Sequence, residues 1–119
     1  FMPDVVWTPE QAESELRTLI QRFRNGVIGF NTKGNYQWTD EQIDALTSFS
    51  YNIGSIYLLT GNATRSNREI AEKMMLYYQV ASNDENIENN LKRRRSIERE
   101  KFLAGTPRDR LDYKPSQTA

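Results

Sequence analysis

The chain has 119 residues, a length that suits one domain with a single modest core. Its hydrophobic share of 37% supports a compact fold, while a mean hydropathy of -0.78 requires that much of each element faces water. The 16 basic residues balance the 16 acidic ones, so a general attraction to nucleic acid or to anionic membranes is not indicated.

Cysteine and histidine are both absent from the sequence. This excludes disulfides, thiol nucleophiles, zinc sites built from Cys and His, and acid–base catalysis by histidine. We therefore expect no metal and no cofactor, and any chemistry must use Asp, Glu, Lys, Ser, Thr or Tyr. Uninterrupted apolar stretches are only a few residues long, so we predict neither a membrane span nor a signal-peptide core.

The first predicted helix begins at a capping box, Thr8-Pro9-Glu10-Gln11. Apolar residues then recur at spacings of three and four, which predicts one apolar stripe of an amphipathic helix: Ala12, Leu16, Leu19, Ile20 and Phe23. The pair Asn25-Gly26 tolerates the left-handed conformation of a helix end, so we predict that the helix stops there. Residues 27–38 lack periodicity and are predicted to form a connection whose end is packed down by Tyr36 and Trp38.

Two further capping boxes, Thr39-Asp40-Glu41-Gln42 and Ser66-Asn67-Arg68-Glu69, predict two more helices. The helix after Thr39 carries an apolar side and ends at Asn52-Ile53-Gly54; its apolar residues are Ile43, Leu46, Phe49 and Ile53. A last helix is predicted from about Ile87 or Leu91 to Leu103, with Gly105 and Pro107 as stop signals. No strand alternation occurs, so we predict an all-α fold, with a helical lobe over residues 1–105 and a tail or linker over 106–119.

Paired carboxylates would indicate glycoside hydrolysis, which needs an acid and a base or nucleophile on either side of one bond. Capping accounts for Glu10, Asp40, Glu41 and Glu69, and pairing with nearby arginines accounts for Glu98 and Glu100. No acidic residue stands out as catalytic.

The run Lys92-Arg93-Arg94-Arg95 is the strongest charge feature of the sequence. It fits a patch that binds an anion such as a phosphate, a teichoic acid or nucleic acid. It also fits a solvated helix face balanced by Glu88, Glu98 and Glu100, with one arginine turned inward. We favour the solvated face because acids are interleaved with the bases.

The segment from Ser48 to Gly54 is the best candidate for binding. Tyr51 and Asn52 would project from the last turn of a helix, and Gly54 would let backbone approach a ligand. An aromatic ring beside an amide suits a sugar, because the ring stacks and the amide bonds hydroxyl or N-acetyl groups. From the residues alone, a core tyrosine followed by an ordinary helix cap is the more common arrangement.

Three separated motifs resemble phage-type lysozymes (endolysins). Residues 39–54 resemble the central helix of that family, residues 8–16 the helix before it, and residues 91–103 its closing helix. Residues 59–71 are similar to the variant in phages of Gram-positive hosts. The resemblance implies a bacteriolytic muramidase that cleaves the β-1,4 bond between N-acetylmuramic acid and N-acetylglucosamine, and a fold with a small catalytic lobe and a helical lobe around a central apolar helix. The residues that match cleft-lining positions are Tyr51, Asn52, Gly54 and Ser55.

The family's catalytic Glu, followed by Asp and Thr, lies upstream of the helix matched here by residues 8–24. Only Phe1 to Trp7 precede that helix, and Asp4 does not fit the pattern. We therefore expect the catalytic residues upstream of Phe1, with the small lobe largely missing and the isolated chain inactive. The resemblance implies two partners, peptidoglycan glycan strands and an N-terminal catalytic segment of the same protein, and location in the host cytoplasm before lysis.

A second hypothesis is a non-enzymatic helical interaction module. In that case the arginine-rich last helix would dock on a partner, and substitution of Arg93, Arg94 and Arg95 would abolish binding without unfolding the chain. The order of the three motifs favours the lysozyme hypothesis, whereas the helical pattern alone fits many bundles.

Overall fold

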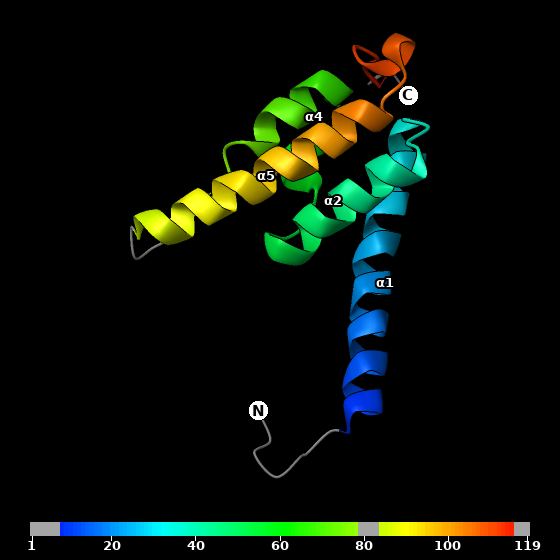
Figure 1. The fold of residues 1–119 in the computed structure, drawn as a ribbon. Helices are drawn as coiled ribbons and strands as arrows, with labels where there is room; N and C mark the ends of the chain where they lie inside the picture. The colour runs from blue at the N-terminus through cyan, green and yellow to red at the C-terminus, as the bar shows by residue number, and fades with distance from the viewer. Residues whose placement is uncertain (1–7, 79–83, 116–119) are drawn as a thin grey trace.

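A computed structural model describes residues 8–78 and 84–115 (Figure 1). These residues form five α-helices and one 3-10 helix and contain no strand, which confirms the predicted all-α class. The elements are α1 (Pro9–Gly34), α2 (Asp40–Asn52), α3 (Tyr57–Thr60), α4 (Asn67–Met74), α5 (Glu85–Gly105) and η1 (Arg108–Arg110).

Helix starts follow the predicted capping chemistry. At Thr8, Thr39 and Ser66 the side-chain hydroxyl accepts a hydrogen bond from the backbone N–H of the residue three positions later. That residue is Gln or Glu, and its side chain accepts a hydrogen bond from the backbone N–H of the cap residue. Helix α5 begins earlier than predicted, because the Asp84 carboxylate accepts from the N–H groups of Asn86 and Ile87 at 2.9 and 3.3 Å.

The predicted end of the first helix at Asn25-Gly26 is wrong. Helix α1 continues to Gly34, so most of the predicted connection over residues 27–38 is helical. The reason lies in packing: Val27 is 1% exposed and Phe30, one turn on, packs against the core, and this burial offsets the weak helix preference of the glycines. The helix ends where Asn35 takes the left-handed conformation, with its N–H bonded to the carbonyls of Asn31 and Thr32.

Helix α2 is the central element, packed against both α1 and α5 (Figure 1). Leu46 and Phe49 are fully buried as predicted, whereas Ile53 at the helix end is 37% exposed. The core is completed by side chains of α4 and α5: Ile70, Ala71, Met74 and Phe102.

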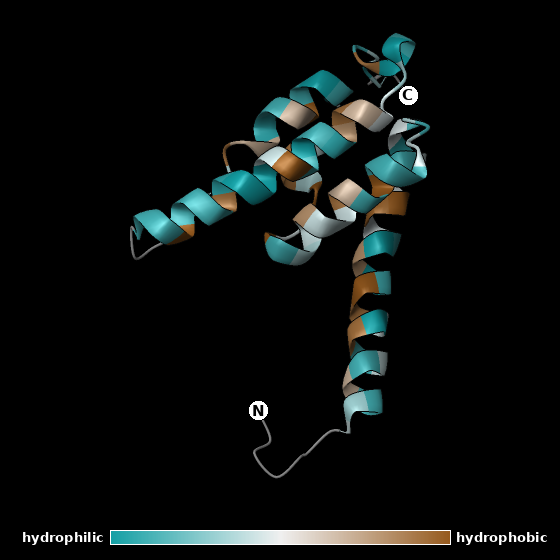
Figure 2. Ribbon diagram, viewed as in Figure 1, coloured by the Kyte–Doolittle hydropathy of each residue, from teal (hydrophilic) through white to brown (hydrophobic). Residues whose placement is uncertain are grey.

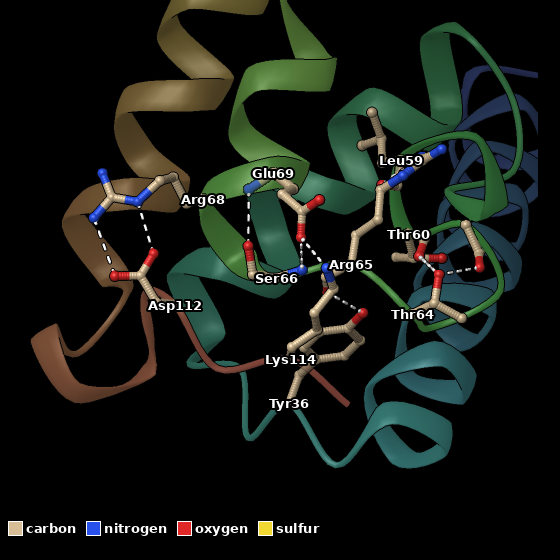
Figure 3. A network of polar contacts seen from close by, with 11 residues as sticks. Tyr36, Leu59, Thr60, Thr64, Arg65, Ser66, Arg68, Glu69, Asp112 and Lys114 are labelled. Carbon is tan, nitrogen blue, oxygen red and sulfur yellow. Dashed lines mark hydrogen bonds and ion pairs between the residues drawn. The ribbon is translucent and has the colours of Figure 1, made fainter. Parts of the chain in front are cut away.

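Tyr36 and Trp38 pack down the end of the segment before α2, as predicted. Their rings stack with centroids 4.5 Å apart. Each polar end is satisfied at long range, because the Trp38 Nε1–H donates to Asn67 Oδ1 at 2.8 Å and the Tyr36 hydroxyl donates to the Arg65 carbonyl at 2.7 Å (Figure 3). Burial raises the pKa of Tyr36, which keeps this hydroxyl a donor.

The N-terminal half of α1 extends away from the other helices (Figure 1). Its apolar stripe is not buried as a core stripe would be: Leu16 is 44% exposed, and Leu19 and Ile20 are 38% and 40% exposed. Figure 2 shows brown, hydrophobic bands along this part of α1. The predicted periodicity is present, but the apolar surface remains open to solvent.

Residues 106–115 belong to the segment predicted as a tail or linker, and they fold back onto the helices. The Arg68 N–H donates to the Leu111 carbonyl at 3.0 Å, and the Arg68 side chain holds Asp112 with two hydrogen bonds (Figure 3). The Tyr113 hydroxyl donates to the Gly34 carbonyl at 2.7 Å, and Pro115 is buried. The division of the chain at residue 105 stays a prediction.

Replacing Gly34 tests how tightly α1 ends against the aromatic pair. A Cβ at Gly34 would lie 2.7 Å from Tyr36 Cδ2, so Gly34→Ala should lower the free energy of unfolding by about 1–3 kcal/mol. The matched control is Gly29→Ala, where a Cβ meets nothing within 4 Å and should raise stability by up to about 1 kcal/mol. Urea denaturation measures both, and equal effects would contradict the steric argument.

Candidate functional site

A groove of about 320 Å³ lies where α1, α2 and α5 meet. Two of the predicted site residues, Tyr51 and Asn52, line it. The remaining lining residues come from three helices: Ile20 and Arg24 from α1, Asp44, Thr47 and Ser48 from α2, and Arg94 from α5. The groove therefore depends on how the three helices pack.

The polar lining of the groove follows from the periodicity of α2. Asp44, Thr47, Ser48 and Tyr51 recur at spacings of three and four, which places them on one face of the helix. The buried face of α2 lies next to this polar face, about one residue earlier in the sequence, and carries Ile43, Leu46 and Phe49. Sequence reasoning named only the end of this polar face, although the same spacing would have extended it back to Asp44.

Tyr51 stands at the edge of the groove and is 44% exposed. Its ring meets Phe23 of α1 edge-on, with centroids 5.8 Å apart and an interplanar angle of 83°. This contact fixes the orientation of the tyrosine while leaving part of its surface to solvent. Tyr51 is therefore not a core residue, and part of its side chain faces solvent at the groove.

Asn52 is tied into the chain at both ends of its amide. Its Nδ2–H donates to the Ser48 carbonyl at 2.7 Å, and its Oδ1 accepts from Arg94 Nη1 at 2.8 Å. One amide N–H and the other Arg94 donors remain for a ligand. The arrangement makes Asn52 the residue that holds a guanidinium at the rim.

Charges around the groove are largely paired. Asp44 accepts from Arg24 at 2.6 Å and lies 3.9 Å from Lys101, and Arg24 also lies 3.8 Å from Asp40. These pairs are partly exposed, so they contribute little stability, but they hold the carboxylate in place. A groove with hydroxyls, one aromatic ring and the Arg94 guanidinium beside an amide suits a hydroxyl-rich ligand.

A buried ion pair lies beneath the groove. The Ser48 hydroxyl donates to Glu98 Oε2 at 2.5 Å, and Glu98 Oε1 lies 2.8 Å from Arg95 Nε. Glu98 is 4% exposed and Arg95 is fully buried, with its guanidinium 5.3 Å from the centre of the Phe49 ring. The Arg95–Glu98 contact is close but not aligned as a hydrogen bond, and the Arg95 nitrogens have no hydrogen-bond partner among the described residues.

Burial raises the pKa of Glu98, with the Ser48 hydrogen bond and Arg95 acting in the opposite direction. A raised pKa is typical of a proton donor, but this carboxyl is sealed behind Ser48 and faces a buried arginine. Glu98 therefore couples α5 to α2 from inside the core and does not reach the groove.

A second hollow of about 200 Å³ has Phe23 among its lining residues. It is lined by Ser55 together with Ser50, Ile56 and residues of α1, while Gly54 lines neither hollow. The Ser55 hydroxyl accepts from the Tyr57 N–H at 3.2 Å. The four predicted site residues therefore do not share one site. Tyr51 and Asn52 line the groove, whereas Ser55 lines the second hollow. Gly54, with a φ of 142°, lies in the turn that links Asn52 to Ser55.

The basic run Lys92–Arg95 does not form one surface. Lys92 lies over the Tyr78 ring at 4.6 Å, Arg94 bonds Asn52, and Arg95 is turned into the core, as the solvated-face interpretation expected of one arginine. Arg93 is exposed. The hypothesis of an interaction module built on this run gains no support from the placement of these side chains.

Neither a cluster of three or more metal-ligating side chains nor a membrane-spanning helix is found over residues 8–78 and 84–115. In that part of the chain, three or more acidic residues do not gather as a metal site would require. Its helices are also too short or too polar to cross a bilayer.

A family model described as phage lysozyme matches residues 2–98, which includes α1 to α4 and α5 as far as Glu98. The chain belongs to the phage lysozyme family. Neither a curated protein nor a solved structure matches it. Membership confirms the resemblance seen in the three motifs and implies a glycoside hydrolase that acts on the peptidoglycan of the bacterial cell wall. The matched residues contain every side chain of the groove.

The buried Arg95–Glu98 pair gives a test of what supports the groove. Glu98→Ala or Arg95→Ala should each lower the free energy of unfolding by about 3–5 kcal/mol, because each leaves an uncompensated buried charge. The double variant Arg95→Met with Glu98→Leu should cost less than either single change. Arg93→Ala, exposed on the same helix, is the control and should change stability by less than about 0.5 kcal/mol. Urea denaturation measures the free energy of unfolding of all four variants. A double variant that loses as much stability as the two single variants together would contradict the pairing.

Proposed function

We propose that this chain supplies the glycan-binding helical lobe of a muramidase, which cleaves the β-1,4 bond between N-acetylmuramic acid and N-acetylglucosamine. The observation that carries the proposal is the open groove at Tyr51, Asn52 and Arg94. Family membership supports peptidoglycan as the substrate.

The groove suits a glycan strand in its chemistry. Tyr51 offers an aromatic surface for the apolar face of a sugar ring, and Arg94 with the free Asn52 N–H offers donors for hydroxyl and N-acetyl oxygens. Gly54 and Ser55 extend the proposed binding surface toward the second hollow, where Ser55 lies beside Ser50. These residues bind and orient the strand, and proton transfer is not among their roles.

The proton donor and its partner come, we propose, from outside residues 1–119. Hydrolysis needs a carboxyl held protonated near neutral pH and a second carboxylate across the bond. Within the described residues, Asp44 is the groove's carboxylate and is held by Arg24, while Glu98 is sealed below Ser48. Neither is placed as a proton donor facing the groove.

The exposed stripe of α1 gives such a catalytic segment a surface to pack on. Ile20 belongs both to this stripe and to the groove lining, so a segment covering Leu16 and Leu19 would lie directly beside the groove. A contiguous apolar surface of this kind marks an interaction site more often than chance exposure. The stripe thus supports an N-terminal catalytic segment of the same protein as the partner.

Substitution of Tyr51 tests glycan binding. Tyr51→Ala should weaken binding of a soluble N-acetylglucosamine–N-acetylmuramic acid oligomer about tenfold, because the ring contact is lost. Asn52→Ala should weaken it less, by releasing Arg94 from the rim. The matched control is Tyr57→Ala, which removes a tyrosine that is 54% exposed and lines neither hollow. Calorimetric titration measures the affinities, and an equal loss in the control would place the site elsewhere.

A fusion protein tests whether this chain binds the glycan while another segment supplies the catalytic carboxyls. The chain alone should release no reducing ends from cell walls, whereas the chain fused behind the Glu-Asp-Thr segment of a phage-type lysozyme should release them. Leu16→Gln with Leu19→Gln should abolish the activity of the fusion by weakening the docking surface. Ser14→Gln with Thr18→Gln changes the opposite face of α1 and should leave the activity intact. Activity of the chain alone would refute the assignment of the catalytic carboxyls to another segment.

A further inference from the structure

A third hollow, of about 360 Å³, lies between α4, α5 and η1. Each of these three elements contributes one arginine to its lining: Arg68, Arg99 and Arg108. The floor is apolar and is formed by Ala71, Leu103 and Leu111. The volume is in the range of sites that hold small organic ligands.

Two of these guanidinium groups have no carboxylate partner in the part of the chain that the structure describes. Arg68 is held by Asp112 at 2.7 and 3.2 Å, which fixes both the side chain and the turn after α5 (Figure 3). Arg99 and Arg108 form no ion pair within 4.0 Å among the described residues. The whole chain has zero net charge, so the three arginines give this hollow a positive charge that the overall composition does not show.

The charge balance limits the ligand. Glu72 also lines the hollow, and Asp112 offsets Arg68, so three guanidinium groups and two carboxylates leave one net positive charge. That balance suits a group with a single negative charge. Guanidinium forks pair well with the two non-bridging oxygens of a phosphate, and the apolar floor can receive the carbon chain on either side.

We propose that this hollow binds a singly charged phosphodiester of a polyol, the chemistry of an anionic wall polymer. Arg99 and Arg108 hold the phosphodiester oxygens, and Leu103 and Leu111 contact the polyol carbons. Arg99 lies five positions after Arg94 on α5, which turns it about 140° away from the groove. The site is therefore separate from the glycan groove and does not depend on the proposed function.

Titration of the whole chain with glycerophosphoglycerol, followed by ¹⁵N NMR of the arginine Nε–H groups, tests the proposal. We expect saturable shifts at Arg99 and Arg108. Arg99→Gln and Arg108→Gln should each weaken binding about tenfold, because each removes a charge-assisted hydrogen bond. Glu72→Gln should tighten binding about two- to fivefold by removing a like charge.

The matched control is Arg93→Gln, which removes an exposed arginine of the same helix that lines none of the three hollows. Its affinity should equal that of the parent chain. Absence of saturable shifts would overturn the proposal, as would a loss in Arg93→Gln equal to that in Arg99→Gln. Tyr51→Ala should leave this binding unchanged, so failure here is distinguishable from failure of the glycan groove.

Two sources of the same chemistry are separated by a second measurement. Poly(glycerol phosphate) should bind with the same dependence on Arg99 and Arg108 as the small diester, whereas vesicles of phosphatidylglycerol should not retain the chain. Retention on vesicles that is lost in Arg99→Gln, together with no binding of the polymer, would overturn the assignment to a wall polymer.

Discussion

The packing of α2 between α1 and α5 positions everything that gives this chain a binding surface. One face of α2 is buried through Leu46 and Phe49, and the adjacent polar face is left at the junction of the three helices. The two faces are offset by one residue along the sequence, so burial of the first places the second at the edge of the core, where Thr47 is 7% exposed and Tyr51 is 44% exposed. The groove is a consequence of this central helix.

The buried Arg95–Glu98 pair has a cost that an apolar pair would avoid. Two charges are removed from water, the contact between them is poorly aligned, and the other arginine nitrogens lack partners among the described residues. The pair fixes the position of α5 relative to α2. Glu98 accepts a hydrogen bond from Ser48 of α2, and Arg95 lies over the ring of Phe49 of the same helix. Rotation of α5 would break both contacts, so the pair fixes Arg94, its neighbour, at the rim of the groove.

Helix α1 has two environments along its length. In its C-terminal half, Val27 and Phe30 pack into or against the core, while Leu16 and Leu19 lie on an arm open to solvent. This asymmetry is costly for an isolated chain, because exposed apolar surface remains hydrated. Under the proposed function, a second segment covers this stripe and lies beside the groove, because Ile20 belongs to both surfaces.

Three helix starts follow from the amino-acid sequence alone, because a capping box is a contact between residues three apart and needs no other part of the fold. The sequence also determined the family, through motifs whose order is a property of the chain. The end of α1, in contrast, depends on long-range packing, since burial of Val27 outweighs the local stop signal at Asn25-Gly26. The tertiary structure likewise decided that Arg24 and Arg94 meet at the groove, that Arg95 turns inward, and that the stripe of α1 stays exposed. These outcomes depend on contacts between residues far apart in the sequence. The periodicity of one helix shows which residues share a face, but not which other helix packs against that face.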